Sequence, residues 1–207
     1  MRKVFEIGGL VAAAVLIAFG VASIAMSVNG RSTVRDSLKL EQITGSADMT
    51  PAGIKTEASK AGLTNITLPT CSVAGQLVDT GARARCFASY MRIHTLEASG
   101  GLTYAQMPRF ATADGKGTND ATAALLSNGK PVDNAARSLW VTETALTTAL
   151  NTSYLAEQIS LFGIVVGFAL LLSGFGFGIL SIGGALRSRE AKPQVEPAKI
   201  GQPVAAS

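Results

Sequence analysis

Two long stretches without a charged side chain dominate the pattern of hydrophobic and polar positions in this chain. The first covers the 24 residues from Ile7 to Gly30, and the second covers the 29 residues from Gln158 to Leu186. About 20 apolar residues in a helix cross a bilayer core that is about 30 Å thick. Both stretches are long enough, so we predict two membrane-spanning helices, at residues 7–28 and 158–186.

A signal peptide is the alternative interpretation of the first stretch. Arg2 and Lys3 precede it, and Ser23-Ile24-Ala25 resembles a small-residue cleavage site. The apolar core of a signal peptide usually has about 7–15 residues, and this stretch is longer. We therefore expect the first helix to be retained.

The basic residues beside the two stretches predict an orientation. The positive-inside rule places both termini in the cytoplasm. Residues 1–6 then form a cytoplasmic N-terminus, residues 29–157 an extracytoplasmic domain, and residues 187–207 a disordered cytoplasmic tail. The predicted location is the cell membrane, with two spans. The basic residues that set this orientation are Arg2, Lys3, Arg187, Arg189, Lys192 and Lys199.

Helical spacing of apolar residues predicts that the segment between the spans is mainly α-helical. Its expected helices begin and end at recognisable signals, such as Thr50-Pro51 at an N-terminus and Gly100-Gly101 at a C-terminus. On the helix at 80–99, one apolar face carries Ala84, Phe87, Met91 and Ala98. The expected segments are an outward continuation of the first span at 31–43, helices at 51–62, 80–99 and 121–127, loop or short extended pieces at 65–78, and a helix from about 132 that runs into the second span.

Small residues repeat at helical spacing on both predicted spans. Such stripes are common in membrane helices, but they also let two helix backbones approach closely. We expect them to pack, either against each other or against a partner. The residues are Gly163, Gly167, Gly174 and Gly178 on the second span, and Ala14, Ala18, Ala22 and Ala25 on the first.

The two cysteines, Cys71 and Cys86, both lie in the predicted extracytoplasmic domain. Cysteines in an oxidising compartment usually pair. A redox or metal-binding pair is the alternative, but 14 residues separate them and no further ligand is near in sequence. We expect one structural disulfide.

Composition and motifs provide no catalytic centre. Hydrophobic residues make up 47% of the chain and charged residues 15%, whereas soluble domains carry about a quarter charged residues. The domain at 29–157 has 12 basic and 11 acidic residues, a net charge of +1 that gives nucleic acid no electrostatic attraction. No GxSxG, HExxH or calcium-loop motif occurs, and the predicted spans contain no internal charge for ion transport. We therefore predict no enzyme activity, cofactor or metal ion.

Four segments, spread over nearly the whole chain, resemble one known family. They are Ile43-Thr-Gly-Ser-Ala-Asp-Met-Thr-Pro, Leu68-Pro-Thr-Cys-Ser-Val-Ala-Gly, the segment from Tyr90 to Met107, Tyr-Met-Arg-Ile-His-Thr-Leu-Glu-Ala-Ser-Gly-Gly-Leu-Thr-Tyr-Ala-Gln-Met, and Trp140-Val-Thr-Glu-Thr-Ala-Leu with the glycine-rich second span that follows it. The chain is similar to uncharacterised two-span membrane proteins of actinobacteria and related high-GC Gram-positive bacteria. Members are often labelled aromatic ring-opening dioxygenases. That chemistry usually needs two histidines and a carboxylate around iron, and this chain has one histidine. The resemblance implies the architecture and a location in the cell envelope, without an active site.

The expected fold is mainly α, with two transmembrane helices flanking a disulfide-linked helical domain. The expected role is a structural or accessory subunit that contacts membrane lipids and other membrane or envelope proteins, or a second copy of itself. The alternative is a ligand- or lipid-binding module with a pocket between the helices at 80–99 and 132–157. Its expected lining is Tyr90, His94, Tyr104, Phe110 and Trp140, although a histidine that holds a neighbour such as Glu97 is the simpler interpretation of His94.

Overall fold

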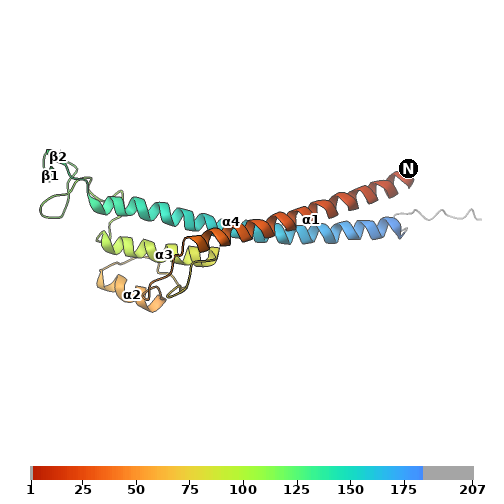
Figure 1. Ribbon diagram of the computed structural model, residues 1–207, viewed down its shortest axis with the longest axis horizontal. Coiled ribbons are helices and arrows are strands. Elements are labelled where there is room, and N and C mark those ends of the chain that lie inside the picture. Colours follow the sequence, from red (N-terminus) through yellow and green to blue (C-terminus); the bar gives the residue numbers. More distant parts are fainter. Residues whose placement is uncertain (1, 184–207) are drawn as a thin grey trace, which may run out of the picture. The chain divides into compact units, whose positions relative to one another are not determined.

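The computed structural model describes residues 2–183, so the predicted tail at 187–207 lies outside the described residues. Their regular structure consists of four helices and one two-stranded hairpin (Figure 1). The long helices α1 (Arg2–Leu40) and α4 (Ala135–Ile182) each contribute to two compact units. One unit contains residues 2–20 and 169–183, and the other contains residues 21–168.

Both long helices have the length and apolar composition needed to cross a membrane, as the sequence predicts. The helix over residues 31–40 continues directly from the apolar stretch, and α4 runs without a break from Ala135. Of the most apolar window in each helix, 11% is buried inside the chain. Most of this apolar surface therefore has no cover from the protein itself.

The smaller unit, residues 2–20 and 169–183, contains a close approach of two helix backbones. A Cβ atom at Gly174 would lie 2.7 Å from Ile17 Cγ1 and 3.1 Å from the Ala13 carbonyl oxygen. A Cβ at Gly178 would lie 3.8 Å from the Ala13 side chain, which is an ordinary contact. Glycine at residue 174 is therefore what allows this packing.

In the larger unit, residues 21–168, α1 and α4 pack through polar contacts. The Ser23 hydroxyl donates a hydrogen bond of 2.8 Å to the Gly163 carbonyl. A Cβ at Gly30 would lie 3.3 Å from Ser160 Oγ, and Gly167 is buried. The predicted glycines thus lie on the packed side of α4. The alanine stripe on α1 does not face α4: Ala14, Ala18, Ala22 and Ala25 are all exposed.

Two shorter helices, α2 (Pro51–Lys60) and α3 (Gly81–Ala98), begin where the sequence predicts. The side chain of Thr50 accepts a hydrogen bond from the Gly53 N–H at 3.0 Å, and that of Thr80 accepts one from the Arg83 N–H at 3.3 Å. Such N-caps satisfy backbone N–H groups that have no partner inside the helix.

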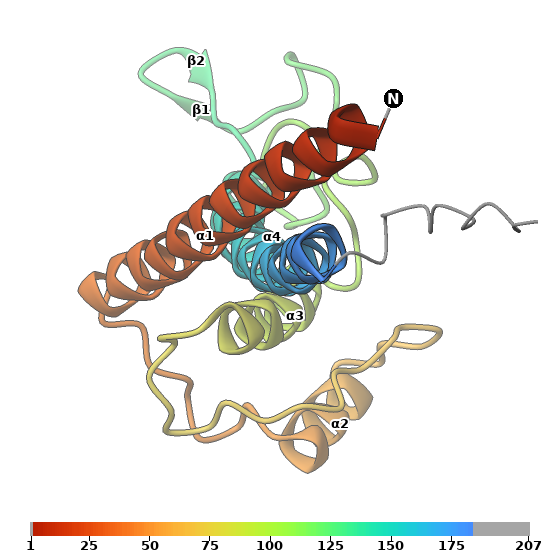
Figure 2. The same ribbon diagram turned by 90° about the vertical axis from the view of Figure 1, so that its right-hand side faces the viewer.

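Helix α3 is the centre of the larger unit. It lies alongside α4, with α2 on its other side (Figures 1 and 2). Its buried residues therefore extend around the helix well beyond the single predicted face, on which Met91 is half-buried and Ala98 is exposed. The buried residues of α3 are Gly81, Ala84, Cys86, Phe87, Ala88, Tyr90, Ile93, Thr95 and Leu96.

The predicted disulfide between Cys71 and Cys86 is present. It connects the segment before α3 to the first half of α3. The Tyr90 hydroxyl reinforces this connection by donating a hydrogen bond of 2.6 Å to the Cys71 carbonyl. Isolated bridges pair Thr44 with Leu77 and Gly45 with Ala74, so the loop at 65–78 contains short extended pieces as expected.

The prediction of a helix at 121–127 is wrong. The structure has turns there, followed by a hairpin of β1 (Leu126–Ser127) and β2 (Lys130–Pro131). Asn128 and Gly129 form the turn with φ angles of 51° and 76°. An Asn-Gly pair adopts positive φ readily and favours a tight hairpin turn, which outweighs the weak helical preference of the preceding alanines.

Candidate functional site

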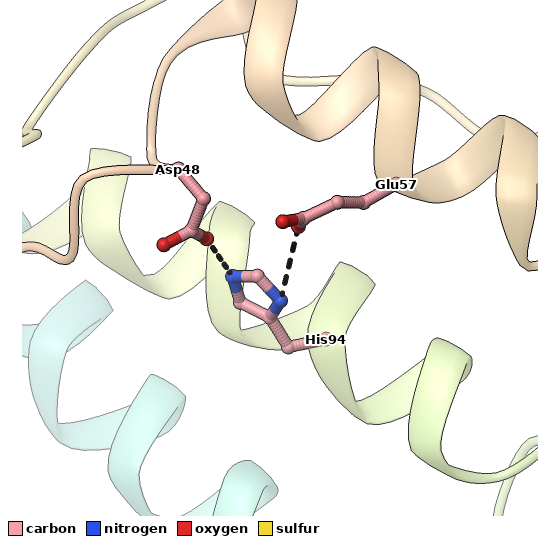
Figure 3. A group of neighbouring side chains, drawn as sticks. All are labelled: Asp48, Glu57 and His94. Carbon is pink, nitrogen blue, oxygen red and sulfur yellow. Dashed lines mark ion pairs between the residues drawn. The ribbon is translucent and has the colours of Figure 1, made fainter.

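One cluster of titratable side chains brings together three separate segments of the larger unit. Asp48 lies in the turn before α2, Glu57 on α2 and His94 on α3 (Figure 3). Asp48 Oδ2 is 3.0 Å from His94 Nε2, and Glu57 Oε2 is 3.7 Å from His94 Nδ1. Glu97, one turn further along α3, places its Oε2 atom 3.8 Å from the same Nδ1. The imidazole ring is thus bordered by three carboxylates.

The facing atoms of this cluster are buried and lack hydrogen bonds. Asp48 Oδ2, Glu57 Oε2 and His94 Nε2 have almost no contact with solvent and no hydrogen-bond partner. The 3.0 Å contact between Asp48 and His94 is close enough for an ion pair but does not have hydrogen-bond geometry. The side chains as a whole remain about 27–30% exposed, so water and ions reach the edge of the cluster.

Hydrogen bonding favours the charged form of Asp48. The Ser46 hydroxyl is the main cause that lowers the pKa of this carboxyl, and His94 contributes in the same direction, against the opposing effect of burial. Burial raises the pKa of the neighbouring Tyr90 hydroxyl, and the negative charge of Asp48 adds to that shift. The ionised form of Asp48 is thus favoured, and the neighbouring Tyr90 hydroxyl stays neutral.

A second charged cluster surrounds Glu157, which ends the predicted extracytoplasmic part of α4. One carboxylate oxygen accepts from Arg31 Nε at 2.9 Å and from Arg35 at 2.6–2.7 Å, and the other accepts from the Gly81 N–H at 2.6 Å. Burial alone raises the pKa of Glu157, but the hydrogen bonds from Arg31, Gly81 and Arg35 outweigh it and lower the pKa. This carboxylate connects α1, α3 and α4.

The structure does not gather the five expected ligand-binding residues into one pocket. Tyr90 is completely buried, and Phe110 is buried near the hairpin. Trp140 is also buried, and its Nε1–H donates to the Leu102 carbonyl at 2.9 Å. His94 belongs to the carboxylate cluster, and Tyr104 is 44% exposed. Between α3 and α4, Leu150 packs in the core, and an open hollow of about 330 Å³, lined by residues such as Arg85, Arg92 and Glu143, contains none of the five expected residues.

Of these five residues, Tyr104 lines an open surface hollow of about 440 Å³. The Arg137 guanidinium stacks 4.2 Å above the Tyr104 ring. Arg109, Asp133 and Asn134 add polar groups to the lining. Small-molecule sites are usually enclosed and mainly apolar, and this hollow is neither.

Sequence reasoning found His94 and its neighbour Glu97 but missed Asp48 and Glu57. No local spacing connects these two carboxylates to His94, because they meet only when α2 packs against α3. Glu157 and its two arginine partners were missed for the same reason: Arg31 is 126 positions from Glu157 in the chain. The clustering of Arg31 and Arg35 on one side of α1, four residues apart, was the available signal.

The described residues therefore define a mainly helical protein with one disulfide and two helices long and apolar enough to span a membrane. We found no protein-family model, curated protein or solved structure that matches this chain.

Proposed function

We propose that this protein is a non-enzymatic integral membrane protein of the cell envelope, which acts as a structural or accessory subunit and binds other membrane proteins. One observation carries this proposal: the apolar windows of α1 and α4 are only 11% buried within the chain. Extensive exposed apolar surface marks contact with a membrane or a protein partner. Lipid and neighbouring membrane helices are the partners that fit this surface.

The proposed orientation places both termini in the cytoplasm and residues 29–157 outside. Arg2 and Lys3 before the first apolar stretch, and the four basic residues after the second, support it through the positive-inside rule. The disulfide between Cys71 and Cys86 supports it independently, because such bonds persist in oxidising compartments.

The filled interior of the domain favours a scaffold over the ligand-binding alternative. Trp140 and Leu150 are buried in the core, and the hollow of about 330 Å³ that remains between α3 and α4 is open and mainly polar, with Arg85, Arg92 and Glu143 in its lining. A domain with a filled interior offers partners its outer surface. On α1, the exposed stripe of Ala14, Ala18 and Ala22 is such a surface, because small residues allow another helix to approach closely.

The orientation is tested by introducing single cysteines for labelling in intact cells. Both native cysteines are in the disulfide, so they do not react with a maleimide. A membrane-impermeant maleimide should label Ser127→Cys in the hairpin without lysis, and Ser188→Cys only after lysis. Labelling of Ser188→Cys in intact cells would contradict the proposed orientation.

The accessory role is tested by purifying the tagged full chain from its own cells in mild detergent. We expect a stoichiometric membrane-protein partner that Ala18→Leu removes, because the exposed alanine stripe is blocked. Phe19→Leu, at an exposed position about 100° around the helix from Ala18, is the control and should retain the partner. Purification of the wild-type protein without a partner would contradict the accessory role and favour the alternative of a ligand- or lipid-binding module.

A further inference from the structure

The cluster of Asp48, Glu57 and His94 has a donor set that suits a metal ion. One donor atom from each side chain lies within 4.8 Å of the other two. They come from three different segments, the turn before α2, α2 itself and α3, so the fold rather than local sequence brings them together (Figure 3). Metal sites are typically built in this way, from ligands supplied by several elements.

The oxygen and nitrogen atoms that face one another in this cluster lack hydrogen bonds, and such atoms can bind a metal cation. Asp48 Oδ2, Glu57 Oε2 and His94 Nε2 are each buried without a hydrogen bond. A buried polar atom without a hydrogen bond is costly, and the 3.0 Å ion pair between Asp48 Oδ2 and His94 Nε2 leaves Glu57 Oε2 3.7 Å from the imidazole. A cation bound among them would accept a lone pair from each of the three.

The charge of the cluster also favours a cation. The ion pairs that Asp48, Glu57 and Glu97 form among the described residues all involve His94. The three carboxylates gather acidic groups in one place, and among the described residues no lysine or arginine pairs with them. A divalent ion bound here would neutralise most of the negative charge of these carboxylates.

Glu97 completes the arrangement. A histidine that binds a metal through one ring nitrogen usually donates its other N–H to a carboxylate, which fixes the ring orientation. His94 Nε2 faces Asp48, and Nδ1 lies 3.8 Å from Glu97 Oε2. Coordination through Nε2 thus leaves Nδ1–H directed to Glu97, and the Glu57 carboxylate, whose Oε2 lies 3.7 Å from Nδ1, has to turn toward Asp48 to reach the ion.

We propose that Asp48, Glu57 and His94 bind a divalent transition-metal ion of the zinc type, which fastens α2 and the preceding turn to α3. An imidazole nitrogen with two carboxylate oxygens suits zinc, whereas calcium and magnesium favour all-oxygen sites. Three protein ligands leave a fourth tetrahedral position for water, which the partial exposure of these side chains permits. The ion's role is to stabilise the domain.

The test uses the full-length protein in detergent, without a polyhistidine tag and after treatment with a chelator. Isothermal titration should show one Zn²⁺ bound per chain, and the melting temperature should rise when Zn²⁺ is added. Co²⁺ should give the visible absorption of a tetrahedral site. His94 is the single histidine of the chain, so its ring protons in an NMR spectrum report metal binding directly.

The variants Asp48→Asn, Glu57→Gln and His94→Gln should each weaken Zn²⁺ binding at least tenfold. Glu97→Gln should weaken it about 10-fold to 100-fold, as loss of an orienting carboxylate does. Glu41→Gln is the matched control, because it removes the same charge from an exposed position in the preceding segment. An intact disulfide and an unchanged helical circular-dichroism spectrum show that each variant is folded.

Two results would overturn the proposal. The first is wild-type protein that binds Zn²⁺ no more tightly than His94→Gln, or that binds Ca²⁺ or Mg²⁺ equally well. The second is a melting temperature that rises on acidification while Zn²⁺ has no effect, which would assign the cluster to a protonated His94 held between carboxylates. The Co²⁺ spectrum and the ring protons of the wild-type protein decide the question even if a variant fails to fold.

Discussion

The Glu157 carboxylate accepts a hydrogen bond of 2.6 Å from the backbone N–H of Gly81, the first residue of α3. It also binds Arg31 and Arg35 on α1. An anion at the N-terminus of a helix is stabilised by the unpaired N–H groups and the helix dipole there. This one side chain therefore accepts a hydrogen bond from a backbone N–H at the start of α3, and it connects α3 to both long helices.

Replacing Glu157 by Gln should destabilise the domain by roughly 1.5–3 kcal/mol, the range for a hydrogen bond to a charged group. The amide has a similar size but leaves two arginines without their counter-charge. Thermal unfolding followed by the fluorescence of Trp140, the single tryptophan, measures the change. An unaltered melting temperature would show that the ion pairs contribute nothing to stability.

Acidification should weaken the same contacts in the wild-type protein. The pKa of Glu157 is lower in the folded chain than its ordinary value of 4.5, so folding favours the ionised form. Its stabilising effect is fully present above the unfolded pKa and is lost as the pH falls through the folded pKa. The melting temperature of Glu157→Gln should depend less on pH below 4.5 than that of the wild type.

Gly81→Ala should also be destabilising, although alanine normally favours helices. Its Cβ would lie 2.7 Å from Tyr154 Cα and 2.9 Å from Glu157 Oε2, so α3 and α4 would have to separate. Overpacking of this kind costs about 1–3 kcal/mol. Gly176→Ala is the matched control, because nothing lies within 4 Å of a Cβ there. Equal melting temperatures of the two variants would contradict the close packing.

Loss of the disulfide should lower the free energy of unfolding by about 3 kcal/mol, because the link restricts the unfolded chain. The variant carrying both Cys71→Ala and Cys86→Ala tests this in denaturant titrations. Reduction of the wild-type protein with dithiothreitol should give a similar loss, and the double variant should not respond to the reductant. A response of the double variant would point to an effect unrelated to this bond.

Tyr90→Phe should destabilise the domain by about 0.5–1.5 kcal/mol, the net value of one hydrogen bond. The lost bond is the one to the Cys71 carbonyl. Tyr104→Phe removes the same hydroxyl from an exposed side chain and should leave the melting temperature unchanged. A similar loss in both variants would assign the effect to the change of residue type.

The sequence predicted the elements that local signals define. Thr50 caps α2 as expected, and α3 begins beside Thr80, where the sequence predicted its start, because helix starts depend on residues within one turn. The hairpin was missed although Asn128-Gly129 is a strong turn signal, because the preceding alanines and leucines were interpreted as helical. The predicted apolar face of α3 was too narrow, since periodicity along one helix does not reveal how many neighbours will cover it.

The candidate site was much less predictable. His94 was noted for its neighbours on the same helix, and Glu97 does approach it. Asp48 and Glu57 contact it through the packing of α2 against α3, which depends on apolar residues such as Ile54 and Ile93 in the shared core. Long-range contacts of this kind leave no spacing in the sequence.

The separation of contacting residues has a consequence for the order in which the domain assembles during synthesis. Cys71 and Cys86 are 15 positions apart, so their bond needs only a short length of chain. Glu157 is 76 positions beyond Gly81 and 126 beyond Arg31. The contacts of α1 and α3 with Glu157 can therefore form only after α4 has been synthesised as far as this residue. Completion of the domain is thus coupled to the emergence of the second apolar helix. A chain that stops before residue 157 lacks the carboxylate that connects α1, α3 and α4.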